Sequence, residues 1–243
     1  MLAGSKYFAT LDMSCSFWQT EVHPEDRDKT AFITRKGQFR YKVLSFGLAN
    51  SPSSFQRLID LVLAGLVWKT CLVYIDDIIL MSETVEQMVE RLDEIFGRLR
   101  NANLKLKPSK CKVFQTEVIF LGHRVGPDGK LGPDPEKVRA VQEWPVPTNV
   151  TEVRAFVALA AYYRKFQAHF SDIAAPLYEL TRKGEKFEWT ERRQQAFEQL
   201  KQALVSAPVL ALPRDEGDWL VDVDCSDWAS GGYFNKDRME SGG

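Results

Sequence analysis

The chain has 243 residues, 44% hydrophobic and 27% charged, which is long enough to bury a substantial core and ordinary for a globular protein. Its formal net charge of −1 excludes a uniformly basic surface, so any contact with nucleic acid must use a local basic patch. The sequence contains four cysteines, with no C-x-x-C pair, and three histidines, and their spacing does not match a zinc site. The pattern therefore predicts reduced thiols.

No stretch is long and apolar enough to form a transmembrane helix, and no charged-then-apolar leader stands at the start. Together with reduced thiols, this predicts an intracellular protein, in the cytoplasm or the nucleus, with no membrane partner. The pattern does not define an oligomeric state.

The first predicted strand, Tyr7–Asp12, ends in a carboxylate. Two further strands are predicted over 30–34 and 39–43, joined by a turn at Lys36-Gly37. Ser51-Pro52 then supplies residues that favour the N-cap and the first position of a helix. Apolar residues follow at helical spacing and predict a core-facing stripe: Phe55, Leu58, Ile59, Val62, Leu63 and Leu66.

The stretch Leu72–Leu80 carries two adjacent acids, Asp76 and Asp77, between two apolar runs. Such runs favour strands and Asp favours turns, so we predict a tight β-hairpin with both acids at its tip. Two solvated acids at a hairpin tip are the alternative. The flanking runs are apolar throughout and favour a hairpin buried on both faces. Paired charges on a buried scaffold are costly unless neutralised, and a divalent cation neutralises them.

Thr84 begins a predicted capping box and a helix whose apolar face holds Met88, Leu92, Ile95, Phe96 and Leu99. The runs 104–107 and 118–121 have the pattern of strands. This order of elements predicts an α+β fold, an antiparallel sheet with packed helices.

A turn-rich segment over 126–133 predicts a boundary before a mainly helical part. Capping and breaking residues predict helices over 134–144, 150–166, 173–182 and from Thr190 to before Pro208. The last predicted strand, 219–227, carries alternating acids, among them Asp224.

Asp12, at the end of the first predicted strand, is a third acid that follows a strand-like run, as Asp76 and Asp77 do. Beside the Asp76/Asp77 hairpin it would place three carboxylates around two metal ions. Mg²⁺ prefers octahedral oxygen ligands and is usually held by one or two carboxylates plus substrate phosphates. Such an arrangement suits in-line displacement at phosphorus.

The run Tyr74-Ile75-Asp76-Asp77 resembles the Y-x-D-D box of reverse transcriptases, and Leu11-Asp12-Met13 followed by Phe17-Trp18-Gln19 resembles their first catalytic block. The resemblance is closest to the polymerases of gypsy-type LTR retrotransposons and runs nearly end to end. Further motifs match in order: 23–27, 29–32, Phe46-Gly47-Leu48, Gln56-Arg57, Phe120-Leu121-Gly122-His123 and 162–166.

This resemblance implies an RNA-directed DNA polymerase fragment with RNA/DNA template-primer and deoxynucleoside triphosphates as partners. It implies a partial palm over 1–125 with the fingers missing, a mainly helical thumb and connection over 126–212, and a truncated RNase H-like start over 213–243. Asp224 would be the one remaining RNase H acid, so no RNase H activity is expected. Two Mg²⁺ ions, with Mn²⁺ possible, would be held by the catalytic residues Asp12, Asp76 and Asp77.

The same resemblance assigns the other site residues. A nucleotide pocket would be formed by Met13, Phe17, Gln19, Phe46, Gly47 and Tyr74. Primer or template would contact Phe120, Leu121, Gly122, His123, Lys105 and Lys107. From the residues alone, Phe17 fits a core ring, Gly47 fits a turn, and the basic stretch from Arg98 to Lys112 fits a charged helix end equally well.

Several positions depart from the family pattern: Ser16 for glycine, Ser45 for proline, and Ala158 and Ala161 for glycine and asparagine. With the expected loss of the fingers, they support a rival hypothesis, a catalytically inactive retroelement remnant that at most binds nucleic acid. The three retained acids support the polymerase.

Overall fold

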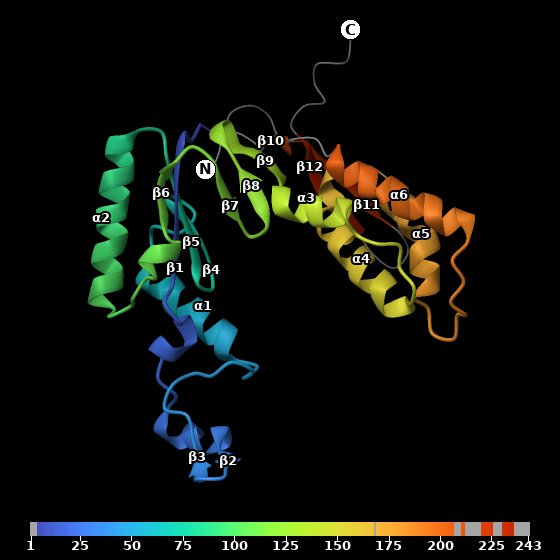
Figure 1. Ribbon diagram of the computed structural model, residues 1–243. Helices are drawn as coiled ribbons and strands as arrows, with labels where there is room; N and C mark the ends of the chain where they lie inside the picture. Colours follow the sequence, from blue (N-terminus) through green and yellow to red (C-terminus); the bar gives the residue numbers. More distant parts are fainter. Residues whose placement is uncertain (1–3, 168, 207–209, 212–219, 226–229, 236–243) are drawn as a thin grey trace.

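The computed structural model describes residues 4–167, 169–206, 210–211, 220–225 and 230–235. Figure 1 shows a sheet with helices α1 (Ser51–Val62) and α2 (Val85–Asn101), and a separate group of helices on the far side of a second sheet. The predicted α+β class is therefore confirmed.

The central sheet is antiparallel and has the strand order β4-β5-β1-β6. Its strands are β1 (Tyr7–Asp12), β4 (Cys71–Tyr74), β5 (Asp77–Ser82) and β6 (Lys112–Gln115). The β4–β5 pair is the predicted hairpin. Because β1 pairs along the whole of β5, two segments distant in the sequence end at the same edge.

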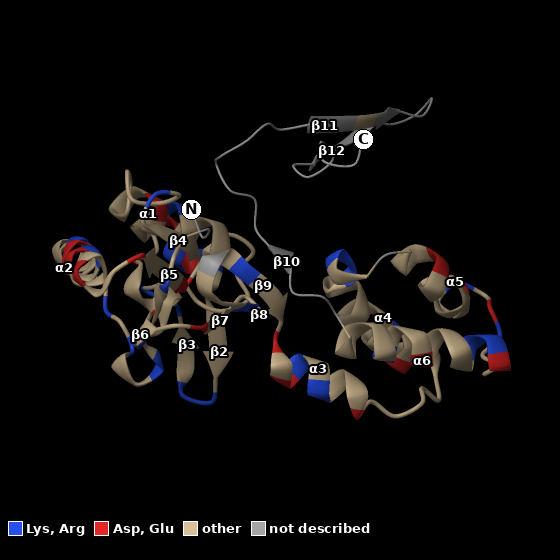
Figure 2. Ribbon diagram, turned by 90° about the horizontal axis from the view of Figure 1, so that it is seen from above, with Lys and Arg blue, Asp and Glu red and all other residues tan. Residues whose placement is uncertain are grey.

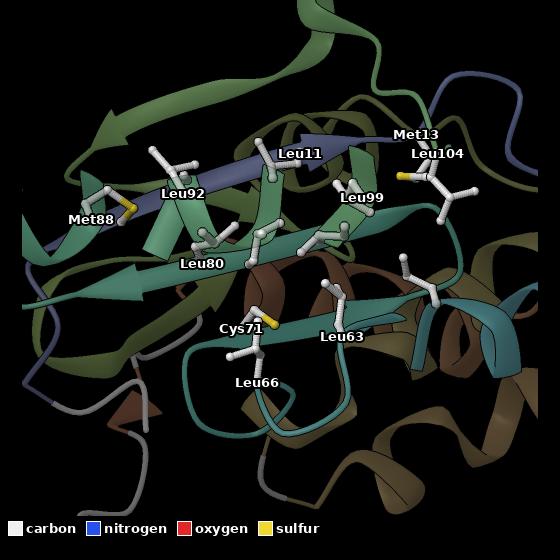
Figure 3. Close-up of a cluster of buried hydrophobic side chains, with 14 of the residues drawn as sticks. Leu11, Met13, Leu63, Leu66, Cys71, Leu80, Met88, Leu92, Leu99 and Leu104 are labelled. Atoms are coloured by element: carbon white, nitrogen blue, oxygen red, sulfur yellow. The ribbon is translucent and has the colours of Figure 1, made fainter. Parts of the chain in front are cut away.

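Strand β5 is buried on both faces, as the apolar runs predicted for the hairpin, whereas β4 is only partly buried and β6 is exposed. Ile78 and Leu80 belong to the buried cluster that includes residues of α1 and α2, in which Figure 3 labels Leu80. Ile79 and Met81 belong to a different cluster, with Val118 and Val125. Full burial of each such side chain contributes about 1.5–3 kcal/mol. The end of the hairpin therefore rests on a rigid support.

Helix α2 begins as predicted. The Thr84 hydroxyl accepts a hydrogen bond of 3.3 Å from the Gln87 backbone N–H, and the Gln87 side chain accepts one of 3.2 Å from the Glu83 N–H. This reciprocal cap satisfies amide groups that the first turn leaves unpaired. Met88, Leu92, Ile95 and Leu99 are buried, whereas Phe96 is partly exposed.

The predicted strands over 30–34 and 39–43 are shorter in the structure: β2 (Phe32–Thr34) and β3 (Gly37–Phe39). Thr30 instead ends a 3₁₀ helix, Pro24–Thr30, because its hydroxyl donates to the Arg27 carbonyl at 2.6 Å and accepts from the Tyr41 N–H at 2.9 Å. The β2–β3 hairpin extends away from the central sheet (Figure 1), and basic residues form its tip (Figure 2).

The predicted strand over 104–107 is wrong; only an isolated bridge joins Leu106 to Met13. The backbone of Lys105 is engaged elsewhere: its carbonyl accepts from the Ser14 N–H at 2.9 Å, and its N–H donates to Gln19 Oε1 at 2.6 Å. Its polar groups are therefore satisfied by a turn and not by a ladder.

A second antiparallel sheet has the order β10-β9-β8-β7. It consists of β7 (Val118–Phe120), β8 (His123–Val125), β9 (Lys130–Pro133) and β10 (Leu210–Ala211). Leu121 and Gly122 form the turn between β7 and β8. This sheet lies between the central sheet and the helical group (Figure 1).

The helical group contains α3 (Pro135–Gln142), α4 (Val150–Tyr162), α5 (Phe170–Leu180) and α6 (Glu191–Val205). Phe156 and Phe197, with ring centroids 4.5 Å apart, lie in its core. Helix α4 ends four residues before the predicted position, and a 3₁₀ turn, Arg164–Phe166, follows. Strands β11 (Leu220–Cys225) and β12 (Ser230–Asn235) pair antiparallel. Among the described residues, none of the helices has the length and apolar character needed to cross a bilayer.

Candidate active site

Asp12 and Asp77 face each other across neighbouring strands. Asp12 is the last residue of β1, Asp77 is the first of β5, and the register pairs them directly. Asp76 occupies the two-residue turn before β5, and its carbonyl accepts a hydrogen bond of 3.0 Å from the Met13 N–H. The structure therefore brings the three predicted acids to one edge of the sheet.

The turn that carries Asp76 has a strained backbone and a dedicated support. Ile75 has φ +52°, a left-handed conformation that is rare for a β-branched residue. Its N–H donates a hydrogen bond of 2.6 Å to Gln56 Oε1 on α1, and Gln56 Nε2 donates one of 2.9 Å to Asp60. Sequence reasoning quoted Gln56 only as part of a motif and missed this supporting role.

The acids interact electrostatically. Burial raises the pKa of the Asp77 carboxyl, and the nearby Asp76 and Asp12 raise it further. Lys110 opposes this effect: its ammonium lies 3.1 Å from Asp12 Oδ2, and that contact raises the pKa of Lys110. The edge therefore holds excess negative charge that one lysine partly neutralises. Sequence reasoning placed Lys110 only in the basic stretch.

The donor chemistry at this edge fits a hard divalent cation, although a complete cage is absent. Among the described residues, no three carboxylate, imidazole or thiol side chains are arranged to hold one ion. Mg²⁺ needs only one or two protein carboxylates when substrate phosphates complete its shell. The facing pair Asp12 and Asp77 meets that requirement.

A cavity of about 190 Å³ opens beside the acids. Its lining combines Asp12 and Asp77 with Lys110 and Lys112, and the 119–121 segment closes the other side. A second cavity, of about 350 Å³, lies near the same segment and is lined by Gln56, Trp68, Tyr74, Phe120 and Leu121, among others. Phe120 and Leu121 thus contribute to both cavities.

The residues predicted to bind a nucleotide fall into two groups. Phe17 packs edge-on against Phe46, with ring centroids 5.4 Å apart; Phe46 is largely exposed, and Gly47 has φ +88° with open space around it. Tyr74 is also exposed at the end of β4. The side chains of Phe46 and Tyr74 are therefore accessible to a ligand, whereas Phe17 is partly buried against the core.

Met13 and Gln19 are already engaged by the protein. The Met13 side chain is buried in the core. The Gln19 amide donates to the carbonyls of Ser14 and Lys105, at 2.6 and 3.0 Å, and accepts from the Lys105 N–H. Gln19 therefore fastens the 14–19 turn to the segment after α2.

The turn between β7 and β8 is held by tyrosines from α4 and its end. Leu121 and Gly122 both have positive φ, +46° and +67°. The Tyr162 hydroxyl donates to the Leu121 carbonyl at 2.5 Å, and the Tyr163 hydroxyl donates to the Gly122 carbonyl at 2.8 Å. A Cβ on Gly122 would lie 3.3 Å from the Tyr162 ring, so glycine suits both the backbone and the space.

His123 also holds this turn, which together with the bonds from Tyr162 and Tyr163 we call the tyrosine clamp. Its Nδ1 lies 2.8 Å from the Leu121 carbonyl, so Nδ1 carries the proton, and Nε2 is buried without a partner among the described residues. Burial lowers the pKa of His123, which favours the neutral ring.

The basic residues of the stretch from Arg98 to Lys112 also fall into two groups, one paired within the protein and one exposed. Arg98 pairs with Glu94 at 3.1 Å, as expected for an ordinary charged helix face. The side chains of Lys105 and Lys107 are exposed, and the Lys107 N–H donates to the Asp12 carbonyl at 2.8 Å. Asp224 lies on β11 opposite Gly231; its side chain is outside the described part of the chain.

Comparison with known proteins agrees with this fold. A family model described as reverse transcriptase (RNA-dependent DNA polymerase) matches residues 1–125, and one described as an RNase H-like domain found in reverse transcriptase matches 189–242. The chain belongs to the reverse transcriptase family. The resemblance to reverse transcriptases is therefore confirmed.

Similar curated proteins are retrovirus-related Pol polyproteins of Drosophila melanogaster. That of transposon 297 is 39% identical over 97% of this chain and 22% of its own length, and that of transposon gypsy is 37% identical over 86% and 21%. The chain thus spans about a fifth of these relatives. A foamy viral protease-reverse transcriptase in complex with double-stranded DNA is 27% identical, with a TM-score of 0.83 over 96% of this chain and 41% of that one.

Proposed function

We propose that this chain carries the catalytic centre of an RNA-directed DNA polymerase. The single observation that carries the proposal is the pairing of Asp12 with Asp77, beside Asp76 in a supported turn, in a chain of the reverse transcriptase family. The reaction would join a deoxynucleotide to a primer 3′-hydroxyl and release pyrophosphate.

In this proposal Asp12, Asp76 and Asp77 hold two Mg²⁺ ions, with Mn²⁺ as a substitute. When bound, the ions supply charge neutralisation and activation of the attacking oxygen. The protein positions the acids on a buried sheet and offers their oxygens at one edge. Catalysis then depends on positioning and electrostatics more than on covalent chemistry.

The cavity beside the acids is the proposed place of the primer end. The 119–121 segment closes it opposite Asp12 and Asp77, and the bonds from Tyr162 and Tyr163 to Leu121 and Gly122 keep the end of that segment in place. Phe17, Phe46, Gly47 and Tyr74 would line the nucleotide pocket, with Phe17 excluding a 2′-hydroxyl. Met13 and Gln19 already form contacts within the protein. We propose that they support the pocket indirectly, Met13 through its backbone N–H and Gln19 through its hydrogen bond to the backbone of Lys105.

The proposed nucleic-acid partner is a template-primer of RNA and DNA. Foamy viral protease-reverse transcriptase has been seen with an RNA/DNA hybrid and with double-stranded DNA, and it supports this assignment. Lys105 and Lys107 are exposed near the acids and suit contacts with phosphates, which carry affinity without sequence preference. We propose the cytoplasm or the nucleus as the location of this activity, in keeping with these substrates.

Primer extension on an RNA template with Mg²⁺ tests the proposal. Wild type is compared with Asp76→Asn, and Asp93→Asn on the exposed face of α2 serves as the matched control. Extension by wild type and the control, abolished by Asp76→Asn, supports the polymerase. No extension by any variant, with duplex binding intact, identifies a remnant that binds nucleic acid only.

A further inference from the structure

Lys110 occupies a defined place at the acidic edge, set by the backbone around it. Lys107 donates its N–H to the Asp12 carbonyl at 2.8 Å, and Lys110 donates its own N–H to the Lys107 carbonyl at 3.0 Å. Lys112 then pairs with Thr10 on β1. The segment 107–112 is therefore fastened to β1 on both sides of Lys110, which directs the lysine toward Asp12.

The contact of Lys110 with Asp12 uses an oxygen that a cation would need. The ammonium nitrogen lies 3.1 Å from Asp12 Oδ2, within ion-pair distance. Both groups line the same cavity, together with Asp77. One positive charge thus lies among three carboxylates, where it offsets part of their mutual repulsion.

The two partners differ in exposure. The Asp12 side chain is 19% exposed, whereas that of Lys110 is 58% exposed. An acid fixed at a strand end has little freedom to move, but a lysine with a solvated, flexible stem can withdraw at small cost. The pair is therefore built to open from the lysine side.

We propose that Lys110 is a tethered counter-ion, which holds Asp12 while the edge is free of metal and which the first divalent cation must displace. This inference rests on the proposed function, since it takes Asp12 as a metal ligand. It assigns to Lys110 a competing role: the lysine weakens cation binding by occupying Asp12 Oδ2 and by repelling positive charge. Part of the negative charge at this edge is then neutralised without metal, and Asp12 Oδ2 becomes free only when a cation displaces the lysine.

Neutralising Lys110 should therefore tighten cation binding. An ammonium about 6 Å from a divalent ion, in surroundings close to water, opposes binding by roughly 3- to 10-fold. Lys112 lines the same cavity but forms no ion pair with a described residue, so its loss tests the effect of charge alone.

The test is Mn²⁺ binding, followed by the electron paramagnetic resonance signal of the free ion at low ionic strength. Wild type, Lys110→Gln, Lys110→Arg, Lys112→Gln and Asp12→Asn are compared, with circular dichroism as the check on folding. Lys110→Gln is expected to bind Mn²⁺ about 3- to 10-fold more tightly, Lys112→Gln less than 2-fold, and Lys110→Arg about as wild type.

Each result decides a separate question. Equal or weaker binding by Lys110→Gln, with Asp12-dependent binding in wild type, overturns the counter-ion role and leaves the proposed function standing. Equal gains in Lys110→Gln and Lys112→Gln also overturn it, since charge alone would then explain the effect. Absence of Asp12-dependent binding in both wild type and Lys110→Gln overturns the proposed metal site and the counter-ion together.

Discussion

The Tyr163 hydroxyl donates a hydrogen bond of 2.8 Å to the Gly122 carbonyl, 41 residues earlier in the chain. This bond, with that of Tyr162 to Leu121, ties the end of α4 to the turn beside Asp12 and Asp77. Burial raises the pKa of Tyr163 to about 12, so its hydroxyl remains a donor at neutral pH. The helical group and the acidic edge are thus joined through one strained turn.

Removing both hydroxyls should loosen that turn. In Tyr162→Phe/Tyr163→Phe, the two carbonyls lose bonds worth about 1 kcal/mol each. Amide hydrogen exchange at Gly122 and His123 should accelerate, while amides of β1 and β5 keep their protection. Tyr178→Phe, on the partly exposed surface of α5, is the control. Unchanged exchange at 122–123 in the double variant would argue against the clamp.

Gln56 is expected to set the geometry of the Asp76 turn. Gln56→Ala leaves the Ile75 N–H without its partner, at a cost of about 1–2 kcal/mol. Urea unfolding should detect that loss, and Asp12-dependent Mn²⁺ binding should weaken because Asp76 is no longer held. Arg57→Ala, next along the exposed side of α1, should change neither quantity. A Gln56→Ala protein with wild-type stability and metal affinity would contradict this role.

Asp77 is expected to lower stability in the absence of metal. Its pKa in the folded chain is raised above the ordinary value, so folding opposes its ionisation. The unfolded chain therefore releases this proton at lower pH, and the contribution of Asp77 to stability is lost as pH rises through the folded pKa.

Asp77→Asn should consequently have a higher melting temperature than wild type at pH 7 without divalent metal, because the folded chain opposes ionisation of Asp77. The difference should disappear near pH 3, where Asp77 is protonated in both states. Mn²⁺ should stabilise wild type more than the variant, because it binds only the folded acidic edge. Thermal melts at both pH values check this. An Asp77→Asn protein that melts below wild type at pH 7 would contradict the prediction.

Phe156 anchors the helical group separately. Its ring lies 4.5 Å from that of Phe197 and 6.0 Å from that of Trp144. Phe156→Ala should cost about 3–5 kcal/mol, detected by urea unfolding followed through tryptophan fluorescence. Hydrogen exchange in β1 and β5 should stay slow, because their core is a different cluster. Simultaneous loss of protection in both regions would show that the two cores unfold as one.

Local rules predicted much of this fold. The cap at Thr84 and the hairpin around Asp76 follow from neighbouring residues, and the structure has both. Helix α1 begins one residue earlier than expected, with Asn50 at the N-cap and Ser51 as the first helical residue. The false strand over 104–107 alternates correctly, but its backbone groups bond to the 14–19 turn, which no local pattern reveals.

For the site, too, the sequence predicted the residues marked by local patterns and motifs but not the contacts between distant segments. The three acids were found from their flanking runs and from family motifs. The roles of Gln56 and Lys110 depend on contacts across 19 and 98 residues, so only the folded chain defines them. The family motif predicts that Gln19 contacts a nucleotide. In the structure its amide instead bonds to the backbone of Lys105, a contact that the motif does not reveal.

Iron-directed backbone cleavage tests the central claim, that Asp12, Asp76 and Asp77 bind one group of cations. Fe²⁺ replaces Mg²⁺ at such sites, and with ascorbate and peroxide it cuts the chain close to where it binds. The account predicts cuts near residues 12, 76–77 and 110 in the same sample, suppressed by excess Mg²⁺ and absent in Asp12→Asn. Cuts at only one of these segments, or cuts that persist in Asp12→Asn, would contradict it.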